Sequence, residues 1–149
     1  MKIILGCGAG KGRVAAPAWQ LYTGSQFTLA FNWARTIVPL RAIYILSAKY
    51  GLVSSLEVIA PYEAKMGTPS QVITVPELAR QVTELGLDQE RPLLVNTGKP
   101  YRKMLDQVLP QSEVLTEHMN TPCTRMGFQR NWFKTHHRKL PESLYAIYV

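Results

Sequence analysis

Two lysines stand in stretches of the sequence where a lysine can bind an anion. Residues 6–12, "GCGAGKG", place Lys11 in a run of small residues, whose exposed backbone N–H groups can form a concave anion site. Residues 45–53, "ILSAKYGLV", place Ser47 and Lys49 between an apolar run and Leu52. A lysine held at the end of a strand is well placed to bind phosphate or carboxylate. Alternatively, residues 6–12 form only a tight turn and Lys49 is a solvated loop residue.

The spacing in residues 6–12 excludes two familiar nucleotide-binding motifs. A P-loop has four residues between its first glycine and the Gly-Lys pair, followed by Ser or Thr, whereas three residues separate Gly6 from Gly10 and Gly12 follows the lysine. A dinucleotide-binding fingerprint needs glycine in place of Lys11 and an acidic residue further on, but residues 1–56 contain no Asp or Glu. The two readings that remain are an anion nest and a tight turn without a ligand.

Acidic and amide side chains that can act on a ligand occur in two later stretches. Residues 59–67, "IAPYEAKMG", place Tyr62 and Glu63 directly after a proline. Residues 96–105, "NTGKPYRKML", begin with Asn96 at the end of an apolar run, and the glycine after it allows a ligand to approach closely. The residues expected to face that ligand are Gly98, Tyr101 and Arg102. Alternatively, Glu63 is a surface residue and Asn96 merely caps the following helix.

Basic and aromatic residues alternate near the C-terminal end of the sequence. No acidic residue occurs in residues 124–139, where Phe128, Trp132 and Phe133 are interleaved with basic residues. Basic side chains beside aromatic ones suit contacts with a nucleic-acid backbone. The residues expected to make these contacts are Arg125, Arg130, Lys134 and Arg138. Alternatively, the segment is an amphipathic helix that buries its aromatic residues, and the two readings are compatible.

Composition bounds the class of protein and its partners. The chain has 149 residues, which fits one domain spanning 1–149, and its formal net charge is +7. This charge favours a polyanionic partner such as a nucleic acid, although a basic surface also serves solubility. Composition does not distinguish DNA from RNA, and the expectation of DNA rather than RNA depends on the family resemblance given below. The oligomeric state is not determined by these features.

Several other classes of protein are not supported by the sequence. No apolar run approaches the roughly 18 residues of a membrane span, so we expect a cytoplasmic protein without membrane contact. Cys7 and Cys123 need not form a disulfide in such a protein. There is no CxxC motif, and the adjacent His136 and His137 point in different directions on a helix, so we expect neither a metal nor another cofactor.

The order of the expected elements places these residues in one fold. Apolar strands are predicted at 2–6, 42–46, 92–96 and 112–115, and an edge strand at 143–149. Helices are predicted at 18–37, where Thr23 and Gly24 can divide the run, and at 76–85, 98–109 and 127–136. This alternation predicts a three-layer α/β fold with a mostly parallel central sheet and helices on both faces. Ligands of such sheets bind beyond the carboxyl ends of the strands, so residues 6–11, 47–52, 96–101 and 117–123 are expected to form one positively charged pocket.

Taken together, the motifs resemble a prokaryotic and phage domain family of unknown function. The family pattern has C-S-x-x-K, then P-A-x-x-L-Y, L-S-A-K-H-G-L, I-x-P-Y-[DE] and G-x-x-Y-R. These motifs correspond to residues 7–11, 17–22, 46–52, 59–63 and 98–102 of this sequence. The resemblance covers most of the chain, to about Phe133. Gly8 replaces the usual serine and Tyr50 the usual histidine. The resemblance implies a fold similar to that of uracil-DNA glycosylases and a link to modified nucleobases.

The resemblance therefore implies a DNA glycosylase-like enzyme that hydrolyses the N-glycosidic bond of a modified base, in phage defence or phage DNA metabolism. We expect Glu63 to orient water or stabilise charge, and Asn96 to share that task. The remaining substrate-binding residues are expected to be Cys7, Lys11, Tyr22, Ser47, Lys49, Tyr50, Tyr62, Gly98, Tyr101 and Arg102. The alternatives are a non-catalytic module that binds a nucleotide or modified base, and an enzyme acting on free nucleosides or small phosphorylated metabolites.

Overall fold

The described part of the chain forms a mixed α/β fold around a five-stranded sheet. The structure is a computed structural model that describes residues 1–64, 66, 72–119 and 126–148. The strands lie in the order β4 (Gly51–Ser54), β3 (Ile43–Ser47), β1 (Lys2–Gly6), β6 (Leu93–Asn96) and β7 (Glu113–Val114). β1 is parallel to β3 and β6, and β6 is parallel to β7, whereas β4 is antiparallel to β3. The expectation of a mostly parallel sheet is confirmed.

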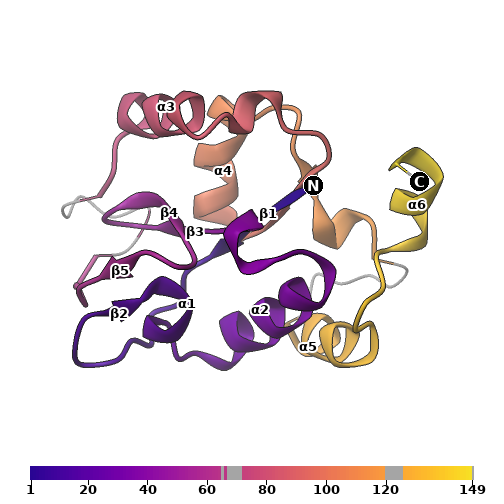
Figure 1. The fold of residues 1–149 in the computed structure, drawn as a ribbon, viewed down its shortest axis with the longest axis horizontal. Helices are drawn as coiled ribbons and strands as arrows, with labels where there is room; N and C mark the ends of the chain where they lie inside the picture. Colours follow the sequence, from indigo (N-terminus) through magenta and orange to yellow (C-terminus); the bar gives the residue numbers. More distant parts are fainter. Residues whose placement is uncertain (65, 67–71, 120–125, 149) are drawn as a thin grey trace.

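Helices pack on both sides of this sheet. Figure 1 shows α1 (Ala18–Leu21), α2 (Ser25–Ile37) and α5 (Met126–Thr135) on one side, and α3 (Val75–Glu84) and α4 (Lys99–Val108) on the other. α6 (Glu142–Tyr148) lies at the C-terminal end. Three short 3₁₀ helices complete the described elements: η1 (Leu40–Ala42), η2 (Leu87–Gln89) and η3 (Leu115–Glu117). A small antiparallel sheet of β2 (Ala16–Pro17) and β5 (Val58–Ile59) lies beside α1.

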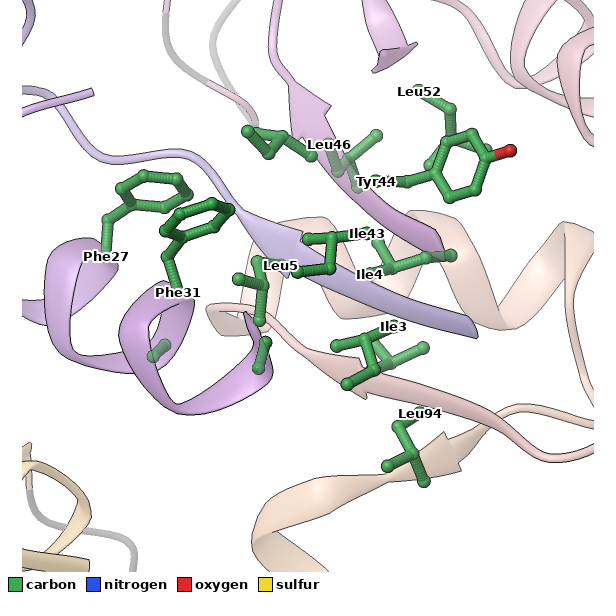
Figure 2. Close-up of a cluster of buried hydrophobic side chains, with 14 of the residues drawn as sticks. Ile3, Ile4, Leu5, Phe27, Phe31, Ile43, Tyr44, Leu46, Leu52 and Leu94 are labelled. Carbon is green, nitrogen blue, oxygen red and sulfur yellow. The ribbon is translucent and has the colours of Figure 1, made fainter. Parts of the chain in front are cut away.

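The central strand is apolar on both faces because both faces are covered. Ile3, Ile4 and Leu5 of β1 are all buried, which explains a continuous apolar run in place of an alternating one. Figure 2 shows Phe27 and Phe31 projecting from α2 toward the strand that carries Leu5. The core therefore fixes the direction of β1 and the place of the loop that follows it.

The observed elements decide one open sequence prediction and correct another. The long run at 18–37 is two helices, since α1 ends at Leu21 and α2 begins after Gly24, as the Thr23-Gly24 break allowed. The edge strand predicted at 143–149 is wrong, because residues 142–148 form α6. Pro141 directly precedes this helix, Glu142 occupies its first turn, and the backbone N–H of Leu144 donates to the Pro141 carbonyl. α6 also follows α5, so the basic helix is not the last element.

None of the helices in the described residues combines the length and apolar character needed to cross a membrane.

Candidate functional site

Buried and half-buried hydroxyl and thiol groups meet where the strands β1 and β3 end. Cys7 follows β1 and Ser47 is the last residue of β3, and both approach the side chain of Tyr62. We call the group the hydroxyl–thiol cluster; its members are Cys7, Tyr22, Ser47, Tyr62 and Tyr101. All five were expected from the sequence to bind substrate, and the structure brings them into mutual contact.

Tyr62 is the centre of this cluster. Its hydroxyl accepts a hydrogen bond of 2.7 Å from Ser47 Oγ and shares one of 2.5 Å with the hydroxyl of Tyr22. The same hydroxyl donates to Cys7 Sγ at 3.6 Å. Cys7 Sγ is also 3.3 Å from the hydroxyl of Tyr101, which α4 supplies. The contacts join segments of the chain that lie far apart in the sequence.

Burial makes the phenols of the cluster poor acids. Desolvation raises the pKa of Tyr22 to about 12, although the hydrogen bond with Tyr62 acts in the opposite direction. Desolvation also raises the pKa values of Tyr62 and Tyr101, and the nearby thiol of Cys7 adds to both shifts. All three phenols are therefore neutral near pH 7, so each can donate a hydrogen bond.

The first cavity of the site lies beside Asn96 and has a volume of about 320 Å³. We call it the Asn96 pocket, and its lining residues are Leu5, Gly6, Cys7, Gly8, Gln26, Phe27, Ala30, Asn96, Thr97, Gly98, Tyr101 and Gln129. Three of these side chains are amides. Gln26 Nε2 donates to Gln129 Oε1 at 3.0 Å, which links α2 to α5 across the pocket wall. The hydroxyl oxygen of Thr97 is buried and has no hydrogen-bond partner in the described part of the chain.

The second cavity lies on the other side of the loop after β1 and has a volume of about 360 Å³. We call it the Lys11 pocket, and its lining residues are Ala9, Lys11, Gly12, Arg13, Pro61, Tyr62 and Glu63. The Nζ atom of Lys11 lies 4.4 Å from the centre of the Tyr62 ring. Cys7 and Gly8 line the first pocket while Ala9 and Lys11 line the second, so this loop borders both.

The single pocket expected from the sequence is therefore two pockets. Lys11 and Glu63 line one, whereas Asn96 lines the other together with Gly98. The two pockets meet at the hydroxyl–thiol cluster. The side chain of Tyr62 lines the Lys11 pocket, Cys7 lines the Asn96 pocket, and the Tyr62 hydroxyl contacts Cys7 between them.

Lys49 lines neither of these two pockets, contrary to the expectation that it faces them. It lies in the turn between β3 and β4, where Ser47 Oγ accepts hydrogen bonds from the backbone N–H groups of Lys49 and Tyr50. The side chain of Lys49 is exposed, with Nζ 5.2 Å from the centre of the Tyr50 ring. Arg102 also lines neither pocket, and its backbone N–H donates to the Gly98 carbonyl at the start of α4.

Tyr50 contacts the cluster without hydrogen bonding to it. Its ring lies edge-on to that of Tyr62, with centroids 5.4 Å apart. Its hydroxyl donates a long bond of 3.5 Å to the carbonyl of Ala60. Tyr50 therefore supports the position of the Tyr62 ring by packing.

The basic helix predicted at 127–136 is α5, and the structure confirms the amphipathic reading, whereas nucleic-acid contact stays a prediction. Trp132 and Phe133 are buried against Trp33, as an amphipathic helix requires. Lys134 is exposed, and Arg130 Nε donates to Gln26 Oε1 at 3.3 Å beside the Asn96 pocket. Arg138 follows α5 and is exposed, whereas Arg125 and Cys123 lie outside the described residues.

The sequence interpretation missed Gln26, Gln129 and Arg13 as lining residues. Gln26 and Gln129 are 103 residues apart, so no local pattern pairs them. Thr97 lies within the segment 96–101 that was expected at the pocket, at the carboxyl end of β6, although it was not singled out as a site residue. Within the described residues, no group of three or more His, Cys, Asp or Glu side chains is arranged to hold a metal ion.

The chain belongs to the family described as "Family of unknown function (DUF6884)", whose sequence profile matches residues 3–135. The match spans the sheet, both pockets and α5. No curated protein and no solved structure shows significant similarity to the chain.

Proposed function

We propose that the protein is a DNA glycosylase-like enzyme that binds a flipped nucleobase in the Asn96 pocket and hydrolyses its N-glycosidic bond. One observation carries this proposal: an amide-lined pocket lies beyond the carboxyl ends of β1 and β6, and one of its amides, Gln129, comes from the basic helix α5. This arrangement provides base recognition and backbone binding side by side.

The chemistry of the pocket suits a nucleobase. Asn96, Gln26 and Gln129 offer carboxamide donors and acceptors, which can pair with the polar edge of a base. Phe27 and Tyr101 add aromatic surface to the wall. The volume of about 320 Å³ lies within the range of small-molecule sites, roughly 300–1,000 Å³.

The position of α5 supports a nucleic-acid substrate over a free base. Arg130 hydrogen-bonds to Gln26 of the pocket wall, and Lys134 is exposed one turn further along the helix. Basic side chains at the edge of a base pocket can bind the flanking phosphates of a strand. The net charge of +7 favours the same class of partner.

Hydrolysis breaks the bond between the sugar C1′ atom and the base nitrogen. The oxygen of a water molecule then bonds to C1′, and the base leaves with a proton. Positive charge develops on the sugar, so a carboxylate near it lowers the barrier. Asn96 is assigned to hold the base or the water, and Glu63 of the neighbouring pocket to stabilise the sugar.

The mostly parallel sheet with a pocket at its edge supports a uracil-DNA-glycosylase-like fold. The substrate in this proposal is a modified base in phage DNA within the cytoplasm.

A second candidate function is binding of a nucleotide or modified base without a reaction. The observation in its favour is that the described residues lining the Asn96 pocket include no carboxylate and no histidine. A pocket of amides and aromatics can hold a base without altering it.

The experiment that separates the two is incubation with phage DNA that carries modified bases, with unmodified DNA of the same sequence as control. Strand scission after mild alkali reports abasic sites and supports the glycosylase. Unaltered DNA with measurable binding supports the module. Absence of both base release and binding would overturn both candidates.

A further inference from the structure

The ammonium group of Lys11 is held in the Lys11 pocket by aromatic faces. Its Nζ atom lies 4.4 Å from the ring centre of Tyr62 and 5.9 Å from that of Tyr22. It donates one hydrogen bond, of 3.2 Å, to the carbonyl of Ala9. Backbone pairing between Lys11 and Tyr22 fixes the stem of the side chain. The charge is therefore held in place before any ligand arrives, which lowers the entropic cost of binding one.

This positive charge is not neutralised by an ion pair. Across the described residues, no carboxylate oxygen lies within 4 Å of Lys11 or Arg13. An ammonium group has three donors, and Lys11 uses one of them for Ala9, so two remain for a ligand. Arg13 is exposed at the same pocket and offers a guanidinium group that can bind an anion with two donors.

Glu63 is the acidic residue among those that line the pocket. Lys11 and Arg13 carry two positive charges against its single negative charge, so the lining residues have a formal charge of +1. A dianionic phosphate that contacts both cations is attracted on balance, while Glu63 weakens the attraction. Neutralising Glu63 is therefore expected to strengthen phosphate binding.

The loop that separates the two pockets is narrow and made of small residues. Cys7 and Gly8 border the Asn96 pocket, and Ala9, Lys11 and Gly12 border the Lys11 pocket. In the described part of the chain, no atom beyond its chain neighbours lies within 4 Å of the place where a Cβ on Gly8 would stand, so the loop surface is open there. One ligand can therefore lie across the loop and reach both pockets.

We infer that the Lys11 pocket is a phosphate subsite, in which Lys11 and Arg13 bind the phosphate of a nucleotide whose base occupies the Asn96 pocket. The inference rests on the proposed role of the Asn96 pocket and extends it, because it defines the ligand as a nucleotide with a phosphate. The phosphate has two possible sources, a phosphodiester of a nucleic-acid strand and the phosphomonoester of a free nucleotide.

The test compares binding of four probes by calorimetry: a modified-base nucleoside, its 5′-mononucleotide, a short single strand that contains it, and inorganic phosphate. Wild-type protein is expected to bind the mononucleotide or the strand at least about tenfold more tightly than the nucleoside, because the phosphate adds charge-assisted hydrogen bonds that the nucleoside lacks. Lys11→Gln and Arg13→Gln are each expected to reduce this preference and to leave nucleoside binding unchanged. Lys11→Arg is expected to retain it.

Matched controls are Lys103→Gln and Arg41→Gln, which alter exposed basic residues that line neither pocket. Arg13 is exposed, so Arg13→Gln tests the subsite even if Lys11→Gln folds poorly. A preference for the mononucleotide identifies a phosphomonoester. A preference seen with the strand alone identifies a phosphodiester. In that case the slope of log K against log salt should fall by about 0.7 for each phosphate of the single strand that a variant no longer binds.

The outcomes for the subsite and for the enzyme can be told apart. If Lys11→Gln and Arg13→Gln bind every probe as the wild type does, the phosphate subsite is overturned even when base release is intact. If a Lys11-dependent preference for phosphate is found while wild-type protein releases no base, the subsite stands and the glycosylase proposal fails.

Discussion

The hydroxyl group of Ser47 donates a hydrogen bond of 2.7 Å to the hydroxyl oxygen of Tyr62, and both side chains are buried. Ser47 ends β3 and also accepts bonds from two backbone N–H groups of the following turn. Tyr62 belongs to the segment after β5 and contacts Cys7 and Tyr22. Through Tyr62, this hydrogen bond connects the β3–β4 turn to Cys7 of the loop that separates the two pockets.

Removing the Tyr62 hydroxyl should destabilise the fold through this network. In Tyr62→Phe the hydroxyl proton of Ser47 loses its buried acceptor and the hydroxyl of Tyr22 loses its buried partner, which typically costs about 1–3 kcal/mol. Urea unfolding should show this decrease in the free energy of unfolding. Tyr50→Phe is the control, because its hydroxyl makes only an exposed bond of 3.5 Å, and a change within about 0.5 kcal/mol is expected. Equal stability of the two variants would show that the network contributes nothing.

The buried tyrosines predict a decrease of stability in alkali. The pKa of Tyr22 is raised from 10.0 to about 12 by burial, so between these pH values the folded state binds more protons than the unfolded state. The contribution of Tyr22 is therefore complete below pH 10 and is lost as the pH rises toward 12. Tyr62 and Tyr101 act in the same direction.

Tyrosinate absorbance measures this directly. At pH 11 the folded protein should ionise fewer of its seven tyrosines than the protein in denaturant. Tyr22→Phe should reduce the difference between the two titration curves. Coincident curves for folded and denatured protein would contradict the assignment of these phenols as buried.

Gly51 should tolerate alanine poorly, because its backbone has a φ of 74° and its neighbours leave no space. A Cβ there would lie 2.1 Å from Cδ1 of Ile73 and 2.2 Å from Oε1 of Gln81. Gln81 bonds the backbone on both sides of Gly51, through the Tyr50 carbonyl and the Leu52 N–H. Moving it breaks two bonds of about 1 kcal/mol each, in addition to roughly 1–2 kcal/mol of backbone strain.

Gly86→Ala is the matched control for this effect. Gly86 has a φ of 69°, but among the described residues no atom beyond its chain neighbours lies within 4 Å of the place a Cβ would occupy. Only the backbone strain of roughly 1–2 kcal/mol is expected there. In thermal unfolding, the melting temperature of Gly51→Ala should lie well below that of Gly86→Ala. The reverse order would contradict the packing around Gln81.

Most of the secondary structure could be predicted from local patterns. β1, β3 and β6 follow from continuous apolar runs, since strands covered on both faces have no polar side. The start of α3 follows from Pro76 and its end from Gly86, which adopts the left-handed conformation. The edge strand predicted at 143–149 is wrong because an alternating pattern over so few residues does not distinguish a strand from a short helix such as α6.

The division of the site into two pockets could not be predicted, because it depends on interactions between distant residues. The hydrogen bond of Tyr62 with Cys7 spans 55 positions, and that of Gln26 with Gln129 spans 103. The exposed position of Lys49 outside the two pockets could not be predicted for a different reason. Gly51 allows a tight turn into the antiparallel β4, so Lys49 lies at the tip of that turn and is exposed to solvent.

Lys134 provides a test of the nucleic-acid surface that leaves the pockets intact. It is exposed on α5 and lines neither pocket, so Lys134→Gln should weaken binding of DNA of any sequence to a similar extent. The slope of log K against log salt should fall by about 0.9 when one phosphate of duplex DNA is no longer bound. Arg41→Gln, at an exposed site on η1, should leave the slope unchanged. Wild-type salt dependence in Lys134→Gln would remove this residue from the DNA surface.

Glu63 and Asn96 line different pockets, so their variants should fail in different ways. Asn96→Ala removes an amide from the base pocket and should weaken binding of the modified nucleoside. Glu63→Gln keeps the shape of the side chain but removes its charge, so base release should fall by roughly 10²-fold or more while DNA binding is retained or strengthened. Single-turnover base release and equilibrium binding, measured on the same preparations, separate the two effects. Glu57→Gln and Asn32→Ala, both at exposed positions outside the pockets, serve as controls. Base release by Glu63→Gln at the wild-type rate would exclude Glu63 from the reaction, and the charge that stabilises the sugar would then have to come from another group.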